Sequence, residues 1–126
     1  MLSDRFRAAA EAKDFSRLEE LTAEDVSFRS PVVFKPYQGR ETLRALLSAV
    51  VQVFEDFRYV DQVETDRTAV LLFKARVGDR ELDGADVLRF DGQGRIAELM
   101  VMVRPMSGVQ ALAEAMQRKL EEAGAL

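Results

Sequence analysis

The feature that most constrains the fold is an apolar stripe along one predicted helix. Its members recur three or four residues apart, at helical spacing: Leu43, Leu46, Leu47, Val50, Val51 and Phe54. Three or four strands are predicted to follow it, over residues 56–64, 68–77, 80–90 and 95–104. Short turns at residues 78–79 and 91–94 would make neighbouring strands antiparallel. A strongly amphipathic helix lying on one curling sheet predicts the α+β class.

Further elements are predicted on both sides of this segment. Ser3 or Asp4 can cap a first helix, and a short second helix is expected after Asp14. A strand over residues 26–30 stops at Pro31, and Ser107 begins a capping-box pattern that starts a last helix. We therefore predict a single domain over residues 1–126, with a curved antiparallel sheet wrapped on the long helix and a C-terminal helix added.

Composition excludes several kinds of chemistry. The chain has neither histidine nor cysteine, which excludes Ser-His-Asp triads, histidine-ligated zinc and thiolate chemistry. Its net charge of −4 and scattered cations argue against a nucleic-acid partner. No stretch approaches the roughly 18 apolar residues of a membrane span, and the N-terminus has no apolar signal-peptide core. We expect a cytoplasmic protein without a metal or cofactor, and with no membrane partner.

Asp86 is the leading candidate for a functional residue. Strand alternation places it on the same side as Leu82, Leu88 and Phe90, on a face that is otherwise apolar. A carboxylate in apolar surroundings resists ionisation, so its pKa should rise. One interpretation is structural: a buried acid held by backbone donors or by an arginine such as Arg104. The other is a protonated acid that donates a hydrogen bond to a ligand oxygen.

A second acid and several ligand contacts are weaker candidates. Asp61 shares strand parity with Tyr59, so it could face the same space and act as a base. The alternative, which we favour, is that Asp61 lies in water near the end of its strand. Eight residues are predicted to line a mainly apolar pocket for a small hydrophobic molecule: Phe28, Ser30, Tyr37, Phe54, Tyr59, Phe73, Leu88 and Val101.

Both faces of the predicted sheet are apolar. Leu71 and Phe73 alternate with Leu72, and Val101 alternates with Met102. A sheet face left in water should be polar, so something must cover the second one. The C-terminal helix or a second subunit can do so. We predict a homodimer packed partly through this outer face.

The chain resembles the nuclear transport factor 2-like superfamily. The resemblance rests on the order of elements, on the loop from Pro31 to Gly39 before the long helix, and on the segment from Phe90 to Ile96. It spans roughly Ser3 to Pro105. The superfamily includes ketosteroid isomerases, SnoaL-like polyketide cyclases and limonene-epoxide hydrolases. It implies a cone-shaped α+β domain with an apolar pocket that is commonly dimeric.

Residue by residue, the resemblance to ketosteroid isomerases is incomplete. Asp86 stands where those enzymes carry a protonated oxyanion-hole aspartate. Ser30 precedes Pro31 where they carry the general-base aspartate, and Phe6 stands where they carry a tyrosine. Steroid isomerisation by that mechanism is therefore not expected. The acidic set of the epoxide hydrolases and the last-strand acid of the cyclases are also replaced, by apolar residues.

Two functions remain open at this point. The first is a small-molecule-binding domain, with Asp86 as a neutral hydrogen-bond donor and with isomerase- or cyclase-like proton transfer if the protein is an enzyme. The alternative is a catalytically inert binding or dimerisation module built on a degenerate enzyme scaffold.

Overall fold

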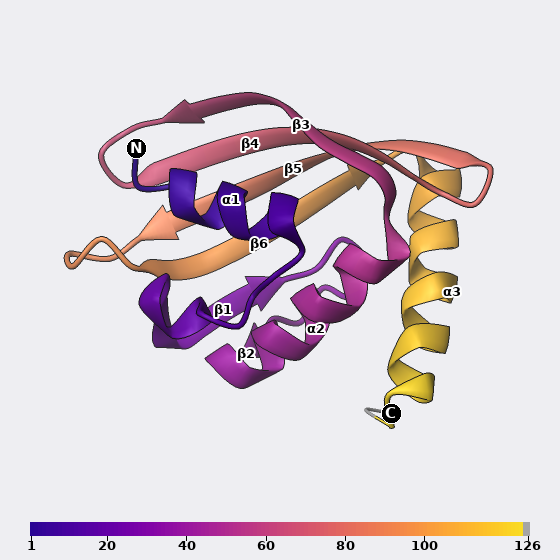
Figure 1. Ribbon diagram of the computed structural model, residues 1–126, viewed down its shortest axis with the longest axis horizontal. Helices are drawn as coiled ribbons and strands as arrows, with labels where there is room; N and C mark the ends of the chain where they lie inside the picture. The colour runs from indigo at the N-terminus through magenta and orange to yellow at the C-terminus, as the bar shows by residue number, and fades with distance from the viewer. Residues whose placement is uncertain (125–126) are drawn as a thin grey trace.

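A computed structural model describes residues 1–124 of the chain and arranges them around one curved, six-stranded sheet (Figure 1). The elements in chain order are α1 (Asp4–Ala12), the short 3₁₀ helix η1 (Leu18–Glu20), β1 (Thr22–Arg29), β2 (Tyr37–Gln38), α2 (Arg40–Val53), β3 (Glu55–Glu64), β4 (Thr68–Val77), β5 (Arg80–Phe90), β6 (Ile96–Arg104) and α3 (Met106–Glu122). The predicted α+β class is confirmed.

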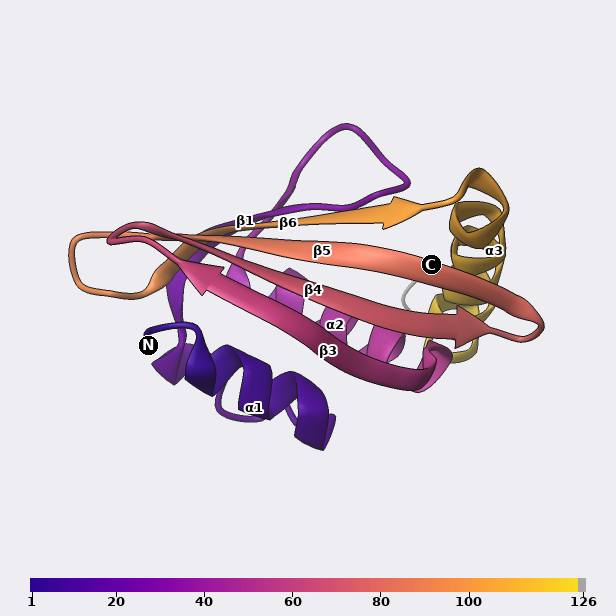
Figure 2. The same ribbon diagram turned by 90° about the horizontal axis from the view of Figure 1, so that it is seen from above.

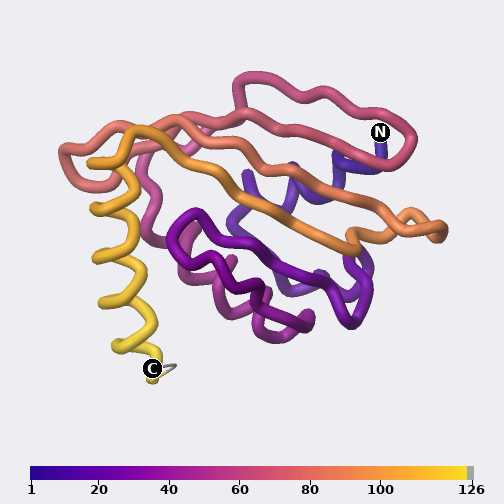
Figure 3. The backbone as a smooth tube through the Cα atoms, turned by 180° about the vertical axis from the view of Figure 1, so that it is seen from behind, coloured from indigo at the N-terminus to yellow at the C-terminus, as the bar shows by residue number. Residues whose placement is uncertain are grey.

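The sheet is mixed, with the strand order β2-β1-β6-β5-β4-β3. Strands β3 to β6 form the predicted antiparallel meander, because hairpin turns connect each of them to the next. The expectation of a wholly antiparallel sheet is wrong at one place, where β1 pairs with β6 in parallel. No hairpin joins these two strands, so turn geometry does not fix their relative direction. Figure 3 shows them side by side although they are far apart in the sequence.

Helices α1 and α2 lie against one face of the sheet, which we call the inner face (Figure 2). The apolar stripe of α2 explains this position: Leu43 and Leu47 are buried and belong to the same core cluster as Leu71 and Leu99 of the sheet. Burying one such leucine contributes about 1.5–3 kcal/mol. The predicted stripe therefore packs against the sheet and holds α2 on the inner face.

The helix starts differ from the predicted capping. Ser3 occupies the position before α1, but its hydroxyl donates to Glu64 Oε1 at 2.6 Å. The same carboxylate accepts the backbone N–H groups of Leu2 and Ser3, at 3.0 and 2.9 Å. An acid on β3 thus satisfies backbone groups at the start of α1. At the other end of the chain, α3 begins at Met106, so Ser107 lies inside its first turn and makes no capping bond.

The outer face of the sheet carries exposed apolar side chains. Val60, Leu72 and Met102 are 52%, 40% and 49% exposed, so α3 does not cover this part of the face. The homodimer expected from this face stays a prediction. Among the described residues, no helix combines the length and the apolar character needed to cross a membrane.

Candidate functional site

A cavity of about 330 Å³ lies between the inner face of the sheet and the helices. Its wall is mostly apolar and includes residues of α1, α2 and α3 as well as of the strands. The polar side chains among the described lining residues are Ser30, Tyr37, Tyr59, Asp86 and Gln117. Asp86 is the acidic member of this set, which gives the apolar space one carboxyl group.

Asp86 lies near the middle of β5, with apolar neighbours on both sides. It pairs with Leu71 of β4 and Val101 of β6, and its side chain is buried, with 7% of the residue exposed. The Tyr59 hydroxyl donates a hydrogen bond of 2.7 Å to Asp86 Oδ2. Within the described residues Oδ1 accepts no hydrogen bond, and no fully buried side-chain oxygen there lacks a partner. It follows that Oδ1 faces the cavity, where a ligand can reach it.

Burial and the tyrosine act in opposite directions on the ionisation of Asp86. Loss of solvation raises the pKa of Asp86 to about 7, and the hydrogen bond from Tyr59 partly opposes this rise. Burial raises the pKa of Tyr59 well above its ordinary range, and the nearby charge of Asp86 adds a smaller rise. Tyr59 therefore stays a donor at neutral pH, while Asp86 is present in both its neutral and its ionised form.

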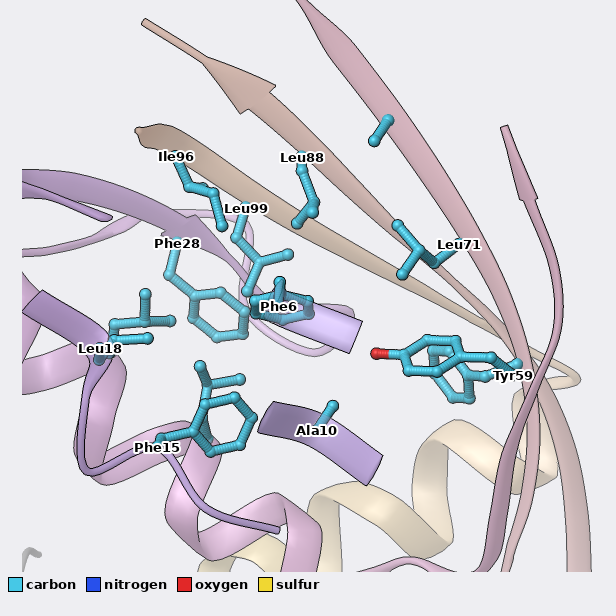
Figure 4. Close-up of a cluster of buried hydrophobic side chains, with 14 of the residues drawn as sticks. Phe6, Ala10, Phe15, Leu18, Phe28, Tyr59, Leu71, Leu88, Ile96 and Leu99 are labelled. Atoms are coloured by element: carbon cyan, nitrogen blue, oxygen red, sulfur yellow. The ribbon is translucent and has the colours of Figure 1, made fainter. Parts of the chain in front are cut away.

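An aromatic wall fixes the Tyr59 ring. The rings of Phe57 and Phe73 meet it edge to face, with centroids 4.9 and 6.3 Å away. Figure 4 shows the Tyr59 oxygen pointing inward from β3 toward the buried apolar cluster. Gly84 makes room for this wall, because a Cβ atom there would lie 2.0 Å from Phe73 Cζ. The guanidinium of Arg7 lies 5.4 Å from the centre of the Tyr59 ring.

Most of the predicted pocket residues lie together around this cavity. Seven of the eight line it: Phe28, Ser30, Tyr37, Phe54, Tyr59, Phe73 and Val101. Leu88 does not. It shares strand parity with Asp86, but it is fully buried in the core, where it pairs with Ala69 and Leu99. Strand alternation identifies the face of a residue, but it does not say where along that face the space opens.

The structure places Asp61 outside the cavity. A β-bulge lies between Tyr59, which pairs with Phe73, and Asp61, which pairs with Leu72. The extra residue in β3 reverses the alternation, so Asp61 is exposed on the outer side and Gln62 takes the inner position. The suggestion that Asp61 faces the same space as Asp86 is therefore wrong, and the favoured alternative of a solvated acid agrees with its position.

Arg104 does not hold Asp86. Its guanidinium pairs with Asp83 at 2.7 Å, on the exposed side of β5. The partner of Asp86 is Tyr59, a pair that was not predicted from the sequence. Tyr59 was predicted to line the pocket, but residues 27 positions apart in the sequence give no local signal of contact. Within the described residues, no cluster of three or more acidic side chains is arranged to hold a metal ion.

Comparison with known proteins gives consistent results. The profile of the SnoaL-like domain matches residues 4–99. A steroid delta-isomerase from Pseudomonas aeruginosa is 45% identical, with a TM-score of 0.94 over 99% of this chain and 93% of that chain. A second solved structure, of an uncharacterised Silicibacter pomeroyi protein with a cystatin-like fold, is 32% identical, with a TM-score of 0.91 over 95% of this chain and 85% of that one.

A more distant structure shares the fold. This nuclear transport factor 2-like protein from Mesorhizobium loti is 23% identical, with a TM-score of 0.73 over 82% of this chain and 88% of that chain. None of the curated proteins matches the chain.

Proposed function

Because the chain belongs to the SnoaL-like domain family within the nuclear transport factor 2-like superfamily, we propose that it binds a small apolar molecule carrying an oxygen and catalyses proton transfer on it. Asp86 is the acid–base group in this proposal, and Tyr59 is its hydrogen-bonding partner. The observation that carries the proposal is the position of Asp86: a carboxyl group inside an apolar cavity, bonded to Tyr59 through Oδ2 and open to the cavity through Oδ1.

The ionisation of Asp86 suits proton transfer at neutral pH. A general acid–base group works best when its pKa lies near the working pH, and the pKa of Asp86 is about 7. Its ionised form can accept a proton from a carbon next to a carbonyl group. Its neutral form can return that proton or donate a hydrogen bond to the ligand oxygen. An isomerisation requires both steps, and the Pseudomonas aeruginosa relative is a steroid delta-isomerase.

The described lining residues include no second carboxyl group, so one acid must both remove and return the proton. This differs from the arrangement that the resemblance to ketosteroid isomerases implies, in which separate aspartates act as base and as oxyanion donor. Phe6 and Ser30, which stand at the replaced positions in that resemblance, both line the cavity. Those replacements favour the second candidate function, an inert binding module on the same scaffold.

One exchange experiment separates the two functions. 2-Tetralone, an apolar ketone with acidic hydrogens next to its carbonyl group, is incubated with the protein in D₂O, and loss of those hydrogens is followed by proton NMR. We expect the parent protein to accelerate exchange above the buffer rate, and Asp86→Asn to return it to that rate. Asp61→Asn is the matched control, because it makes the same substitution at an exposed position outside the cavity.

The same experiment has two further outcomes. The rate in the parent should rise with pH through about 7, because the ionised form of Asp86 is the base. Binding of 2-tetralone without faster exchange would select the inert module. Native mass spectrometry of protein purified from cell extract then identifies the natural ligand class. An apolar compound that accompanies the parent and is lost in Asp86→Leu supports the binding site in either case.

A further inference from the structure

Helix α3 lies outside residues 4–99, the segment matched by the SnoaL-like profile, yet it forms part of the cavity wall. Five of its side chains line the cavity: Leu112, Ala113, Met116, Gln117 and Leu120. A helix that faces the same space as Asp86 is a natural place for ligand selectivity.

The first half of α3 is fixed against the strand that carries Asp86. Gly108 is buried, and a Cβ atom at that position would lie 3.0 Å from Leu82 Cβ. Leu112, one turn further along, is 3% exposed. Leu82 and Asp86 lie on the same face of β5, so this contact sets the position of the helix relative to the carboxyl group.

The second half of α3 is packed less completely. Met116 and Leu120 line the cavity but are only half-buried. The part of the wall formed by Phe6 of α1 and by Phe15 is closed, because these two residues are 2% and 4% exposed. Val32 and Val33, in the loop between β1 and β2, also line the cavity and are 48% and 42% exposed. The cavity is therefore closed at α1, and it opens toward α3 and this loop.

We propose that α3 is the specificity element of the site and that it recognises the apolar outer part of an elongated ligand whose oxygen lies at Asp86. This inference rests on the proposed binding function and names the ligand class: an amphiphile with a single oxygen at one end and an apolar body at the other. Met116 and Leu120 are the specificity-determining residues. The exposed parts of these two side chains leave water when the outer part of the ligand packs on them, and that burial favours long ligands over short ones.

A series of 4-alkylphenols, from 4-ethylphenol to 4-octylphenol, tests this inference by calorimetric titration. The phenol oxygen is the group for Asp86 Oδ1, and the alkyl chain extends toward α3. In the parent, affinity should rise by about fourfold for each methylene that is fully buried. Met116→Ala should lower the affinity for 4-octylphenol by about five- to tenfold and the affinity for 4-ethylphenol by less than about twofold. Only the long alkyl chain reaches the truncated side chain.

The controls separate the two ends of the site. Met106→Ala makes the same substitution on the same helix at a residue that is 77% exposed and does not line the cavity, so every affinity should stay unchanged. Asp86→Leu should lower the affinity for every 4-alkylphenol by a similar factor, because it removes the hydrogen bond to the phenol oxygen that all of them carry. Leu120→Ala repeats the test of α3, and circular dichroism confirms that each variant is folded.

The possible results are distinct. A loss of affinity that grows with chain length in Met116→Ala and Leu120→Ala supports the inference. Equal losses at all chain lengths, or no loss, overturn the role of α3 while the Asp86→Leu result still supports the proposed function. A parent protein that binds none of the phenols contradicts both. If Met116→Ala does not fold, the length dependence in Leu120→Ala decides the outcome alone.

Discussion

Asp86 should make the stability of this fold fall as pH rises, which is opposite to the usual behaviour of a carboxyl group in an ion pair. The ordinary pKa of the group is 3.8, and burial raises it to about 7 in the folded protein. Between these two pH values the unfolded chain has lost the proton while the folded chain retains it. Folding therefore takes up a proton, and raising the pH through this window disfavours the folded state.

The size of the effect follows from the shift. Each pKa unit corresponds to about 1.4 kcal/mol, so a rise from 3.8 to about 7 makes a difference on the order of 4 kcal/mol across the window. This contribution is fully present below pH 4 and is lost by about pH 8. Asp86→Asn replaces the carboxyl group by a neutral one of similar shape that can still accept the Tyr59 hydrogen bond, so the variant lacks the pH-dependent part.

Urea unfolding of the parent and of Asp86→Asn between pH 4 and pH 9 measures this difference. The variant should gain about 1.4 kcal/mol over the parent per pH unit between roughly pH 4 and 7, with a plateau above. Asp83→Asn is the control: the bonds from Lys74 and Arg104 lower the pKa of Asp83 below its ordinary value of 3.8, so its contribution is lost only at lower pH, and its difference from the parent should stay nearly flat between pH 4 and pH 9. Parallel curves for the parent and Asp86→Asn would show that Asp86 is ionised and solvated, which refutes the reasoning.

Three further predictions follow from particular contacts. Tyr59→Phe removes a hydrogen bond to a charged group, worth about 1.5–3 kcal/mol, so the pKa of Asp86 measured by carbon NMR should rise by about one to two units. Tyr37→Phe, which removes the other hydroxyl of this type from the cavity wall, should leave that pKa unchanged. Gly84→Ala should lower the free energy of unfolding by about 1–3 kcal/mol, because the new methyl group meets Phe73, whereas Gly92→Ala, with no atom within 4 Å, should not. Light scattering should find a dimer for the parent and a monomer for Leu72→Lys on the exposed outer face, and a monomeric parent would contradict the predicted homodimer.

Much of the architecture could be predicted because it depends on local patterns. The helical spacing from Leu43 to Phe54 marked α2, and the alternation and turns from residue 56 to residue 104 marked the meander within one or two residues. Such patterns report directly which side of an element is apolar, and burial of that side selects the layer arrangement. The inward position of Asp86 came from the same alternation.

The sequence by itself therefore determined the fold class, the inner face and the strand that carries the buried acid. Only the tertiary structure decided which group meets that acid. Tyr59 on β3 bonds to Asp86 on β5 across the intervening strand β4, and the missing side chain of Gly84 leaves room for the Phe73 ring. The bulge that turns Asp61 outward, the parallel pairing of β1 with β6, and the approach of α3 to the cavity were likewise decided in three dimensions. The physical reason is that periodicity fixes the direction of a side chain within its own element, whereas a contact depends on register and packing between elements.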